Sequence, residues 1–387
     1  MVDVVIIGGG PGGLSAAVRL AGNGFSVSVL EEHETPGEPV HCTGILGSEA
    51  CDEFEIPPSA ILNQLRSLRL FSPAGQVVPY TTEVAQAVVI DRRDFDQAIW
   101  TRAKSLGVQL IRGYRAHDIR LQNNGLSVES ADLPPIHARA CILACGANYT
   151  LQRKLSLGMP PLFLRTAQVE LPARKRQSSV EIHFGVDIAP HGFAWVVPVF
   201  RTTGDFARIG LMCRRNPEAH FDRFIAGIST RWGIDRSSYQ RPRLKMLPLA
   251  PIRRTYLDRL LVVGDAAGLV KPTTGGGIYY SILSARLAAD VLSEALEKDD
   301  LGAGFLQKYE ERWRARLNDE FEAQLTLRRL AQTLRDEDIE NFFDLAKSDG
   351  IIPLIRSTAR FNQHRDLIVA LLKHPEARKI FGRYMRF

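Results

Sequence analysis

Cysteine and long hydrophobic runs are both scarce in this sequence. Its 387 residues include five cysteines, an odd number with no two spaced as CxxC, so neither a disulfide framework nor a metal site is expected. The apolar runs are far shorter than the roughly 18 to 20 residues that span a bilayer, and the first residues lack the basic and apolar segments of a secretory signal. We therefore expect a cytoplasmic protein with reduced thiols, and peripheral contact with the inner face of the membrane stays open.

An excess of charge of one sign is also absent from most of the chain. Lys and Arg number 49 against 43 Asp and Glu, a formal net charge of +6. Residues 356–387 contain eight of the basic and two of the acidic residues, so this tail carries the whole excess. Apolar residues such as Leu367 and Leu371 lie among its cations, which fits either a solvated terminal helix or a peripheral membrane contact. No nucleic-acid-binding motif accompanies the basic residues, so no nucleic-acid partner is expected.

The first thirty residues have the order of a dinucleotide-binding fold. Residues 3–7 form a short β-branched run, typical of a buried parallel strand. Gly8, Gly10 and Gly13 follow as GxGxxG, a pattern that permits a tight turn and lets the backbone approach a pyrophosphate at a helix N-terminus. Glu31 ends the next strand, where a carboxylate binds ribose hydroxyls. This order predicts a Rossmann-like domain, and by itself it does not separate NAD from FAD.

The rest of the chain divides into three kinds of pattern. A strand, a helix and a further strand are predicted over residues 88–112, and alternating apolar runs between residues 165 and 213 predict an antiparallel sheet in a strand-rich, helix-poor region. Residues 258–265 return to a buried strand that ends in Gly-Asp, and the pattern is helical from residue 301. The predicted fold is α/β (α+β overall): a Rossmann-like domain with a mainly parallel sheet, an inserted antiparallel β-sheet domain and a C-terminal helical region. The expected boundaries are 1–70 with 85–150 and 258–300, then 71–84 with 151–257, and finally 301–387.

Three motifs resemble a known family. They are GGGPGG together with Glu31, DRRDFD at residues 91–96, and above all VGDAAGLVKPTTGGGI at residues 263–278. The chain is similar to FAD-dependent oxidoreductases of the p-hydroxybenzoate hydroxylase fold and, within that fold, resembles the geranylgeranyl reductase family over about residues 1–300. The resemblance implies that the Rossmann-like domain binds FAD and that the inserted sheet domain binds the substrate.

The resemblance also implies which residues contact the FAD. Asp265 would meet the ribityl chain, Cys42 would lie near the ribityl chain or the isoalloxazine, and Ala116 would contact the adenine end through its backbone. The loop that carries Cys42 is one residue tighter than the family's CGEG. The full set of expected cofactor-binding residues is Gly8, Gly10, Gly13, Glu31, Cys42, Arg92, Ala116, Asp265, Gly275, Gly276, Gly277 and Ile278.

A further segment resembles the family's substrate motif. PHGFAWVVP at residues 190–198 fits PxxYxWxFP at every spacing, with Phe193 in place of Tyr and Val197 in place of Phe. Phe193, Trp195 and Val197 alternate along a strand, so all three side chains point to one face. The resemblance implies that this face lines an apolar substrate pocket, and an ordinary sheet core around Trp195 is the alternative.

The resemblance implies that the enzyme saturates C=C bonds of an isoprenoid or polyprenyl lipid by hydride transfer from reduced flavin. Hydroxylases of the fold carry Asp-Gly where this chain has Cys145-Gly146, and halogenases need an N-terminal lysine, whereas no lysine precedes Lys104. An FAD-dependent monooxygenase or oxidase acting on another apolar or aromatic substrate stays open. So does a non-enzymatic flavoprotein that serves in electron transfer or assembly.

Two steps of the reaction are left unassigned by the sequence. The proton donor is unknown, with His41, Cys42 and an ordered water as candidates. There is no second GxGxxG motif, so the reductant can be NAD(P)H bound transiently or an electron-donor protein such as ferredoxin.

Overall fold

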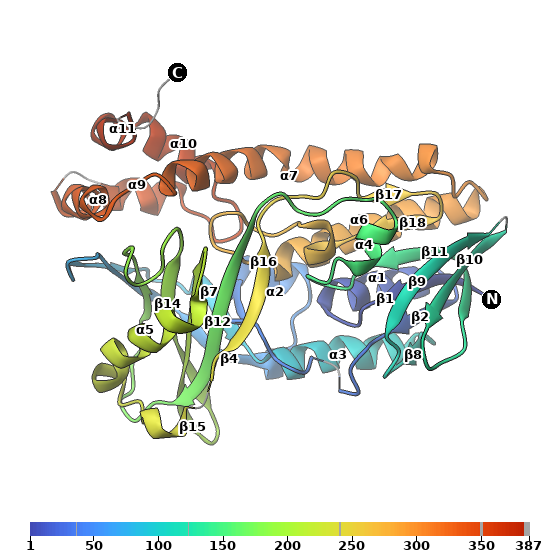
Figure 1. Ribbon diagram of the computed structural model, residues 1–387, viewed down its shortest axis with the longest axis horizontal. Helices are drawn as coiled ribbons and strands as arrows, with labels where there is room; N and C mark the ends of the chain where they lie inside the picture. The colour runs from blue at the N-terminus through green and yellow to red at the C-terminus, as the bar shows by residue number, and fades with distance from the viewer. Residues whose placement is uncertain (36, 123, 240, 349–350, 383–387) are drawn as a thin grey trace. The chain divides into compact units, whose positions relative to one another are not determined.

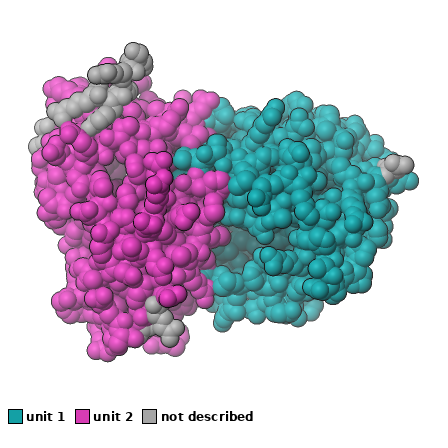
Figure 2. Space-filling model, viewed as in Figure 1, with its two compact units in different colours: residues 1–40, 92–162, 248–318 teal, residues 41–91, 163–247, 319–387 magenta. Residues whose placement is uncertain are grey.

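The structure is a computed structural model that describes residues 1–35, 37–122, 124–239, 241–348 and 351–382. Contacts between residues divide the chain into two compact units, drawn in two colours in Figure 2. Unit 1 comprises Met1–Val40, Arg92–Leu162 and Pro248–Asn318, and unit 2 comprises His41–Asp91, Phe163–Leu247 and Asp319–Phe387. Each unit is therefore built from three separate stretches of the chain.

Unit 1 contains a mixed sheet with a parallel centre (Figure 1). Its main path is β17-β18-β11-β1-β2-β8, and the antiparallel strands β10 and β9 extend from β11. Strand β1 is parallel to both of its neighbours, β2 and β11, and its apolar residues are buried, as expected for the centre of a βαβ sheet. The strands are β1 (Val2–Ile7), β2 (Val27–Leu30), β8 (Gln109–Ile111), β9 (Ala116–Gln122), β10 (Gly125–Ser130), β11 (Ile136–Leu143), β17 (Tyr256–Leu257) and β18 (Leu260–Val262).

The α-helices that lie wholly within the described residues of unit 1 are α1 (Pro11–Gly22), α3 (Arg92–Ser105), α4 (Thr150–Lys154) and α6 (Ile278–Glu297). Helix α1 connects β1 to β2 and packs against both α3 and α6. The predicted order of strand, glycine turn, helix and strand is confirmed. Helix α6 follows the second glycine-rich segment, so two helices of this unit begin at glycine-rich turns.

Unit 2 is organised around a seven-stranded sheet in the order β16-β12-β15-β14-β13-β5-β6. Its neighbouring strands are antiparallel from β12 to β13 and from β5 to β6, whereas β13 and β5 are parallel. The predicted antiparallel sheet is thus confirmed. The strands are β5 (Ser67–Phe71), β6 (Val77–Thr81), β12 (Phe163–Pro172), β13 (Val180–His183), β14 (Phe193–Arg201), β15 (Gly204–Cys213) and β16 (Arg243–Pro248).

A helix follows the strand-rich part of the inserted domain. Helix α5 (Pro217–Trp232) covers one face of the seven-stranded sheet and buries Phe221 and Ile225 against Ile209 and Leu211 of β15. The helix has Pro217 at its start and ends at Gly233 in the left-handed conformation, which are ordinary helix start and stop signals. The helix follows the strand-rich residues 165–213, within which the structure has strands and no helix, as predicted.

The remaining elements of unit 2 are a small sheet and a set of helices. The small sheet has the order β3-β7-β4 and uses only residues before Asp91. The predicted C-terminal helices are present, and α7 begins in unit 1 and continues into unit 2. These elements are β3 (Ile45–Gly47), α2 (Ser48–Glu53), β4 (Ile61–Leu65), β7 (Ala87–Ile90), α7 (Ala303–Ala331), α8 (Asp336–Ser348), α9 (Ile351–Thr358), α10 (Arg365–Lys373) and α11 (Pro375–Gly382).

The basic tail folds back onto the preceding helices. Ala377 of α11 is buried in one apolar cluster with Leu345 of α8 and Ile351 of α9, and Leu371 of α10 packs against the same cluster. Part of the apolar surface of the tail is therefore used in packing within unit 2. None of the helices in the described ranges combines the length and apolar character needed to cross a membrane.

The compact units divide the chain differently from the predicted domains. The sequence places residues 41–70 and 85–91 in the dinucleotide-binding domain, whereas the contacts place all of His41–Asp91 in unit 2. The physical reason is strand pairing, because β5 pairs with β13 of the seven-stranded sheet. The helices after residue 318 also belong to unit 2 rather than to a separate region.

Candidate functional site

The first glycine loop is shaped by close backbone packing. Gly8 has a φ of 111°, and a Cβ added there would lie 2.3 Å from the carbonyl oxygen of Ala144. A Cβ on Gly13 would lie 2.0 Å from the carbonyl oxygen of Gly8, so both positions require glycine. Gly10, in contrast, has no atom within 4 Å of the corresponding position. The loop is thus tight on the protein side and open at Gly10, where the first turn of α1 begins without a capping side chain.

Glu31 lies beside this loop at the end of β2. Its carboxylate accepts hydrogen bonds from the backbone N–H of Gly9 at 2.8 Å and of His33 at 2.9 Å, and its side chain is 12% exposed. The backbone N–H of Tyr114 donates to the carbonyl of Glu31 at 2.9 Å, which brings the segment that leads to Ala116 next to the same strand end. One region of unit 1 therefore brings together, as the sequence predicts, Gly8, Gly10, Gly13, Glu31 and the segment that leads to Ala116.

The second glycine loop connects β18 to α6 and places Asp265 at the start of that helix. A Cβ on Gly277 would lie 2.7 Å from Oδ1 of Asp265, so the carboxylate rests directly against the glycine backbone before Ile278. The hydroxyl of Tyr149 donates to the carbonyl of Asp265 at 2.7 Å, and Nε2 of Gln152 donates to that of Ala266 at 3.1 Å. These two side chains, which the sequence does not single out, hold the turn in place.

The two helices that begin at these loops are joined at their N-terminal ends. Ser281 of α6 fits between two glycines, because a Cβ on Gly12 would lie 2.5 Å from its Oγ and a Cβ on Gly264 would lie 2.4 Å from it. Further along the helices, Nδ2 of Asn23 donates to Oγ of Ser293 at 2.9 Å. The N-termini of α1 and α6 thus lie side by side, and each carries the partial positive charge of a helix start.

This arrangement fits the FAD that the sequence predicts. Two uncapped helix starts provide backbone N–H groups for a pyrophosphate, Glu31 provides an acceptor for ribose hydroxyls, and Asp265 provides a second carboxylate at the other loop. Gly275 has a φ of 75°, a conformation that favours glycine where a backbone must approach a ligand closely. The contact of each of these residues with the cofactor stays a prediction.

Arg92 makes an ion pair of its own. Its Nε and Nη2 donate to the two carboxylate oxygens of Asp96 at 3.0 and 2.8 Å, and the Asp96 carboxylate is almost fully buried. This bidentate pair fixes the guanidinium at the start of α3. A contact between Arg92 and the cofactor stays a prediction.

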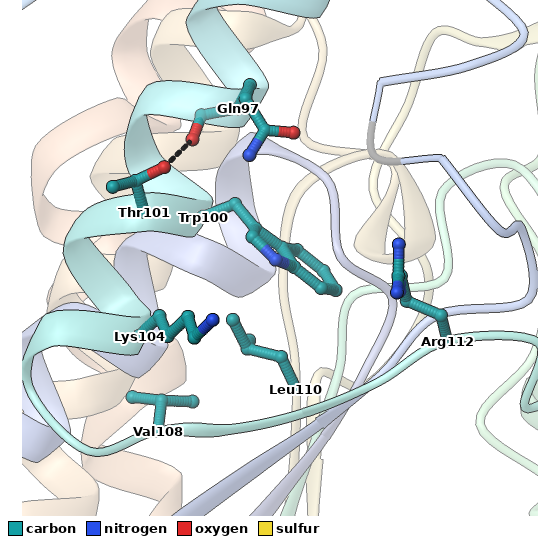
Figure 3. Close-up of a pocket in the computed structure, with 7 residues that line it drawn as sticks. All are labelled: Gln97, Trp100, Thr101, Lys104, Val108, Leu110 and Arg112. Carbon is teal, nitrogen blue, oxygen red and sulfur yellow. Dashed lines mark hydrogen bonds between the residues drawn. The ribbon is translucent and has the colours of Figure 1, made fainter.

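A pocket of about 430 Å³ lies between α3 and the segment around β8 (Figure 3). Trp100 forms part of its wall and also lies behind the first glycine loop, since a Cβ on Gly9 would be 3.2 Å from Cζ3 of the indole. Lys104 and Arg112 are two cationic side chains in the lining. An indole beside two cations suits an anionic group attached to a flat ring. The sequence does not indicate this pocket, because its residues come from a helix and a strand without a motif.

In unit 2, the strand β14 carries the predicted substrate motif. Its register with β15 and β12 groups the side chains on one side of the sheet, opposite α5, into three rows. We call this side the Trp195 face, defined by Phe193, Met212 and Thr166 in the first row, Trp195, Gly210 and Gln168 in the second, and Val197, Arg208 and Glu170 in the third. The alternation that places Phe193, Trp195 and Val197 on one face is therefore present, and their contact with a substrate stays a prediction.

Trp195 has a polar atom without a partner on this face. The indole lies over Gly210, where a Cβ would be 2.4 Å from the ring, and the residue is 9% exposed. Its Nε1 is buried and makes no hydrogen bond with the part of the chain that the structure describes. The ring of Phe193 packs edge-on against it with the centroids 5.9 Å apart, so the face offers two aromatic rings and one unused N–H donor.

The predicted Cys42 loop lies on the same face. Nε2 of His41 is 3.1 Å from Oγ1 of Thr166, and Oγ1 of Thr43 donates to Oε1 of Gln168 at 2.8 Å. Cys42 accepts a hydrogen bond from the backbone N–H of Gly44 at 3.3 Å. The structure thus brings His41, Cys42 and the Trp195 face together within unit 2, whereas the glycine loops belong to unit 1.

His41 is uncharged at neutral pH. Burial, together with the smaller effects of the positive charges of Lys245 and Arg243, lowers its pKa to about 4. Both cations belong to β16, the strand that neighbours β12 at the edge of the sheet. His41 therefore acts as a neutral hydrogen-bonding group rather than as an imidazolium.

A partly buried ion-pair network, which the sequence analysis does not predict, supports the Cys42 loop. Nε of Arg208 donates to Glu170 at 2.6 Å, and its Nη1 donates to the backbone carbonyls of Thr43 and Ile90 at 2.8 and 2.9 Å. Arg201 donates to Glu170 at 2.8 Å and also pairs with Asp91. Burial raises the pKa of Glu170, but the hydrogen bond from Arg201 and the charge of Arg208 outweigh this effect and hold the pKa below its ordinary value. Charged residues at inward positions of apolar strands were the signal for this network.

Similarity to known proteins extends over nearly the whole chain. Residues 6–61 match the family described as NAD(P)-binding Rossmann-like domain. The chain is 30% identical over 354 residues to digeranylgeranylglycerophospholipid reductase of Methanocaldococcus jannaschii, covering 87% of this chain and 88% of the relative. It is also 30% identical to digeranylgeranylglycerophospholipid reductase 2 of Methanothermobacter thermautotrophicus, covering 87% and 90% of the two chains.

Two solved structures share the fold. A geranylgeranyl bacteriochlorophyll reductase-like protein from Thermoplasma acidophilum superposes with a TM-score of 0.84 at 23% identity, covering 99% of both chains. The halogenase PltM in complex with phloroglucinol and FAD superposes with a TM-score of 0.69 at 17% identity, covering 99% of this chain and 85% of the halogenase.

Proposed function

The chain belongs to the geranylgeranyl reductase family of FAD-dependent oxidoreductases, and on this premise we propose that it saturates carbon–carbon double bonds in the isoprenoid chains of a lipid. The observation that carries the proposal is the near full-length similarity to the archaeal reductases, which are named for a digeranylgeranylglycerophospholipid. The paired glycine loops of unit 1 and the aromatic Trp195 face of unit 2 are the two sites that such a reaction needs.

The bound FAD, once reduced, supplies the hydride that is added to the alkene. The chain's own residues bind and orient the two reactants. The uncapped starts of α1 and α6 hold the pyrophosphate, and Glu31 and Asp265 accept hydrogen bonds from hydroxyl groups of the cofactor. Phe193, Trp195 and Val197 hold the apolar chain and keep water from it.

The second hydrogen of the reduction arrives as a proton. His41 has a pKa of about 4, so at neutral pH it has no imidazolium proton to give. The Cys42 thiol lies beside it on the same loop and carries an S–H group. Of the two side chains among the candidate donors, we therefore favour Cys42, with His41 as its neutral neighbour, and an ordered water is the third candidate.

The proposal names the electron donor and the place where the enzyme acts by class only. NAD(P)H and ferredoxin both remain compatible with the chain, and the pocket beside Trp100 has the charge and the flat ring to favour a nucleotide. A peripheral contact with the inner face of the membrane would bring the enzyme to a lipid substrate, with the exposed cations of the tail as one attachment point.

The proposal is tested with the purified protein under anaerobic conditions. The protein should be yellow, and after reduction with dithionite it should be reoxidised by geranylgeranyl phosphate, yielding a product heavier by one H₂ for each bond reduced. A colourless protein that takes up no flavin would overturn the cofactor assignment. Consumption of NADPH accompanied by formation of hydrogen peroxide would instead identify an oxidase, and formation of an oxygenated product would identify a monooxygenase.

A further inference from the structure

A lysine lies buried against the second glycine loop of unit 1. Lys271 is 3% exposed and follows Val270, which is fully buried. Lysine is among the residues that are almost never fully buried in proteins unless negative groups compensate the charge. A lysine buried beside a loop that is expected to contact a cofactor is therefore a candidate for a role toward that cofactor.

Backbone hydrogen bonds close the segment from Lys271 to Gly276 into a compact loop. The backbone N–H of Lys271 donates to the carbonyl of Gly276 at 3.1 Å, and the backbone N–H of Gly275 donates to the carbonyl of Lys271 at 2.8 Å. Gly275 has a φ of 75°, in the region that favours glycine. The two hydrogen bonds thus fix the lysine relative to the glycines that precede α6.

The side chain of Lys271 packs directly against Gly276. A Cβ on Gly276 would lie 2.7 Å from Cε of the lysine and 3.3 Å from its Nζ, and the next nearest atom would be Oγ1 of Thr274 at 3.7 Å. The lysine therefore occupies the space in which a side chain at position 276 would lie. Glycine at this position lets the nitrogen of the lysine come close to the loop.

The position of this loop along the FAD follows from the order of the expected contacts. Glu31 is expected at a ribose, the first glycine loop at the pyrophosphate, and Asp265 at the ribityl chain. A Cβ on Gly277 would lie 2.7 Å from Oδ1 of Asp265. Because the ribityl chain connects the pyrophosphate to the isoalloxazine, the glycines beside Asp265 are expected near the ring. Lys271, which packs against Gly276, is then at the end of the cofactor that accepts and gives the hydride.

We propose that the side-chain nitrogen of Lys271 carries a positive charge that stabilises the negative charge of the reduced isoalloxazine, so that the bound FAD is easier to reduce. This inference rests on the FAD of the proposed function and adds a residue that sets the reduction potential of that FAD. A hydride is a proton with two electrons, so its addition to the neutral oxidised ring leaves one negative charge on the ring until a second proton binds.

The surroundings of Lys271 favour such an interaction. A cation held away from bulk water interacts with a nearby negative charge more strongly than it would in water, and protein charges near the ring nitrogens change the electronic properties of a flavin. The uncapped start of α6 adds partial positive charge next to the same loop. The negative charge of the reduced ring in turn offsets the cost of burying the ammonium group.

The test measures the midpoint potential of the FAD in the purified holoenzyme without substrate. Lys271→Met keeps much of the apolar length of the lysine and removes its charge. Reduced FAD should therefore lose at least about tenfold more affinity than oxidised FAD, which for a two-electron couple is a fall of about 30 mV in the potential. Lys271→Arg keeps the charge and should hold the ratio of the two affinities within about threefold of the wild type.

The matched control is Lys298→Met. This variant removes an exposed cation at the other end of α6, a helix of 20 residues, which places the change roughly 30 Å from the glycine loop. Over that distance the charge is screened, so the potential should stay at the wild-type value. An equal fall in Lys271→Met and Lys298→Met would overturn the proposal, and so would equal losses of affinity for oxidised and reduced FAD in Lys271→Met.

A second measurement needs no variant and decides the proposal even where Lys271→Met does not fold. The wild type should bind reduced FAD at least about tenfold more tightly than oxidised FAD, so its potential should be at least about 30 mV above that of free FAD. A wild-type potential at or below that of free FAD would overturn the role of Lys271. If the potentials behave as expected but the wild type reduces no isoprenoid, the role of Lys271 stands and the proposed reaction fails.

Discussion

At the scale of single residues, the positions that matter most are those where a side chain has no room or no partner. Gly8 and Gly13 have no room for a Cβ because a backbone carbonyl occupies the place. Trp195 has a buried N–H donor without a partner, and His41 has a proton affinity that burial and two cations reduce. Each of these conditions leads to a measurement on a single substitution.

Gly13→Ala should abolish tight FAD binding. The added methyl group would lie 2.0 Å from the carbonyl oxygen of Gly8, so the loop must open and lose its shape around the pyrophosphate. The matched control is Gly22→Ala, at the other end of α1, where no atom lies within 4 Å of the added Cβ and alanine favours the helix by roughly 0.5 to 1 kcal/mol. Flavin content after purification is the measurement. Equal flavin content in the two variants would contradict the role assigned to the loop.

His41 should make the protein less stable in acid. Its pKa is about 4 in the folded protein and 6.5 in the ordinary state, so between these pH values the unfolded chain takes up a proton that the folded protein does not. The free energy of unfolding should therefore fall as the pH decreases from 6.5 to 4, by about 1.4 kcal/mol per pH unit at most. Above pH 6.5, the protonation of His41 should make no contribution to the pH dependence of stability.

Urea unfolding at several pH values measures this effect. The variant His41→Asn should lose less stability between pH 6.5 and 4 than the wild type. His183→Asn is a useful comparison, because burial also lowers the pKa of His183, although that residue lies against Glu181 rather than beside Lys245. If His41→Asn and the wild type respond to pH in the same way, the lowered pKa of His41 is wrong.

At the scale of elements, the Cys42 loop is held by a strand rather than by its own sequence. Arg208 extends from β15 and donates to the carbonyls of Thr43 and Ile90, while Gly44 has a φ of 68° that lets the loop turn over the guanidinium. A Cβ on Gly44 would lie 2.4 Å from Nη1 of Arg208. The loop conformation thus depends on an ion pair formed between β12 and β15.

Arg208→Met should loosen this loop. The change should cost less unfolding free energy than the about 3 to 5 kcal/mol of a fully buried pair, because the Glu170 side chain is 27% exposed and keeps Arg201 as a partner. The carbonyl of Thr43 loses its donor. The rate at which iodoacetamide alkylates Cys42, followed by mass spectrometry under native conditions, should therefore increase.

Arg201→Met is the matched control for this prediction. It also breaks a pair with Glu170, but it keeps both hydrogen bonds from Arg208 to the backbone. Arg201→Met removes ion pairs of a more exposed side chain, with both Glu170 and Asp91, and should leave the reactivity of Cys42 near that of the wild type, whereas Arg208→Met should raise it. Equal alkylation rates would show that Arg208 stabilises the fold without positioning the loop.

At the scale of the whole molecule, residues 356–387 carry the net charge of +6. In the structure the same residues also contribute to the packing of unit 2. The tail helices α10 and α11 pack on α8 and α9 through buried apolar residues, so cutting the tail off would expose the cluster and disturb the fold. Exposed cations such as Lys373 and Arg378 stay available for an anionic surface and can be removed without touching the packing.

Lys373→Gln/Arg378→Gln should weaken binding to vesicles that contain anionic lipid. Each cation near such a surface contributes about 1 kcal/mol, so two removed cations correspond to roughly a 30-fold decrease in the partition constant at low salt. Flotation with phosphatidylserine-containing vesicles measures the change. The control Arg174→Gln/Lys175→Gln removes two exposed cations from unit 2 outside the tail. If the two double variants float equally well, the tail has no role in membrane binding.

Features that depend on neighbours along the chain could be predicted from the amino-acid sequence. Gly8, Gly10, Gly13 and Glu31 could be assigned because a strand, a tight turn, a helix and a second strand follow one another within about thirty residues. The alternation at residues 193–197 fixed which side chains share a face for the same local reason. Family membership also followed from short motifs.

Only the tertiary structure decided which distant segments meet. Nothing in the spacing of Ser281, Gly12 and Gly264 indicates that one serine fits between two glycines at the joined starts of α1 and α6. The same holds for His41, which lies beside the cations of β16 some 200 residues later in the chain. Such contacts depend on strand order and on the space left between packed elements, and residues far apart in sequence carry no local periodic signal of either. Local motifs therefore indicate which residues take part in the chemistry of this protein. The fold determines how the segments that carry these motifs are brought together.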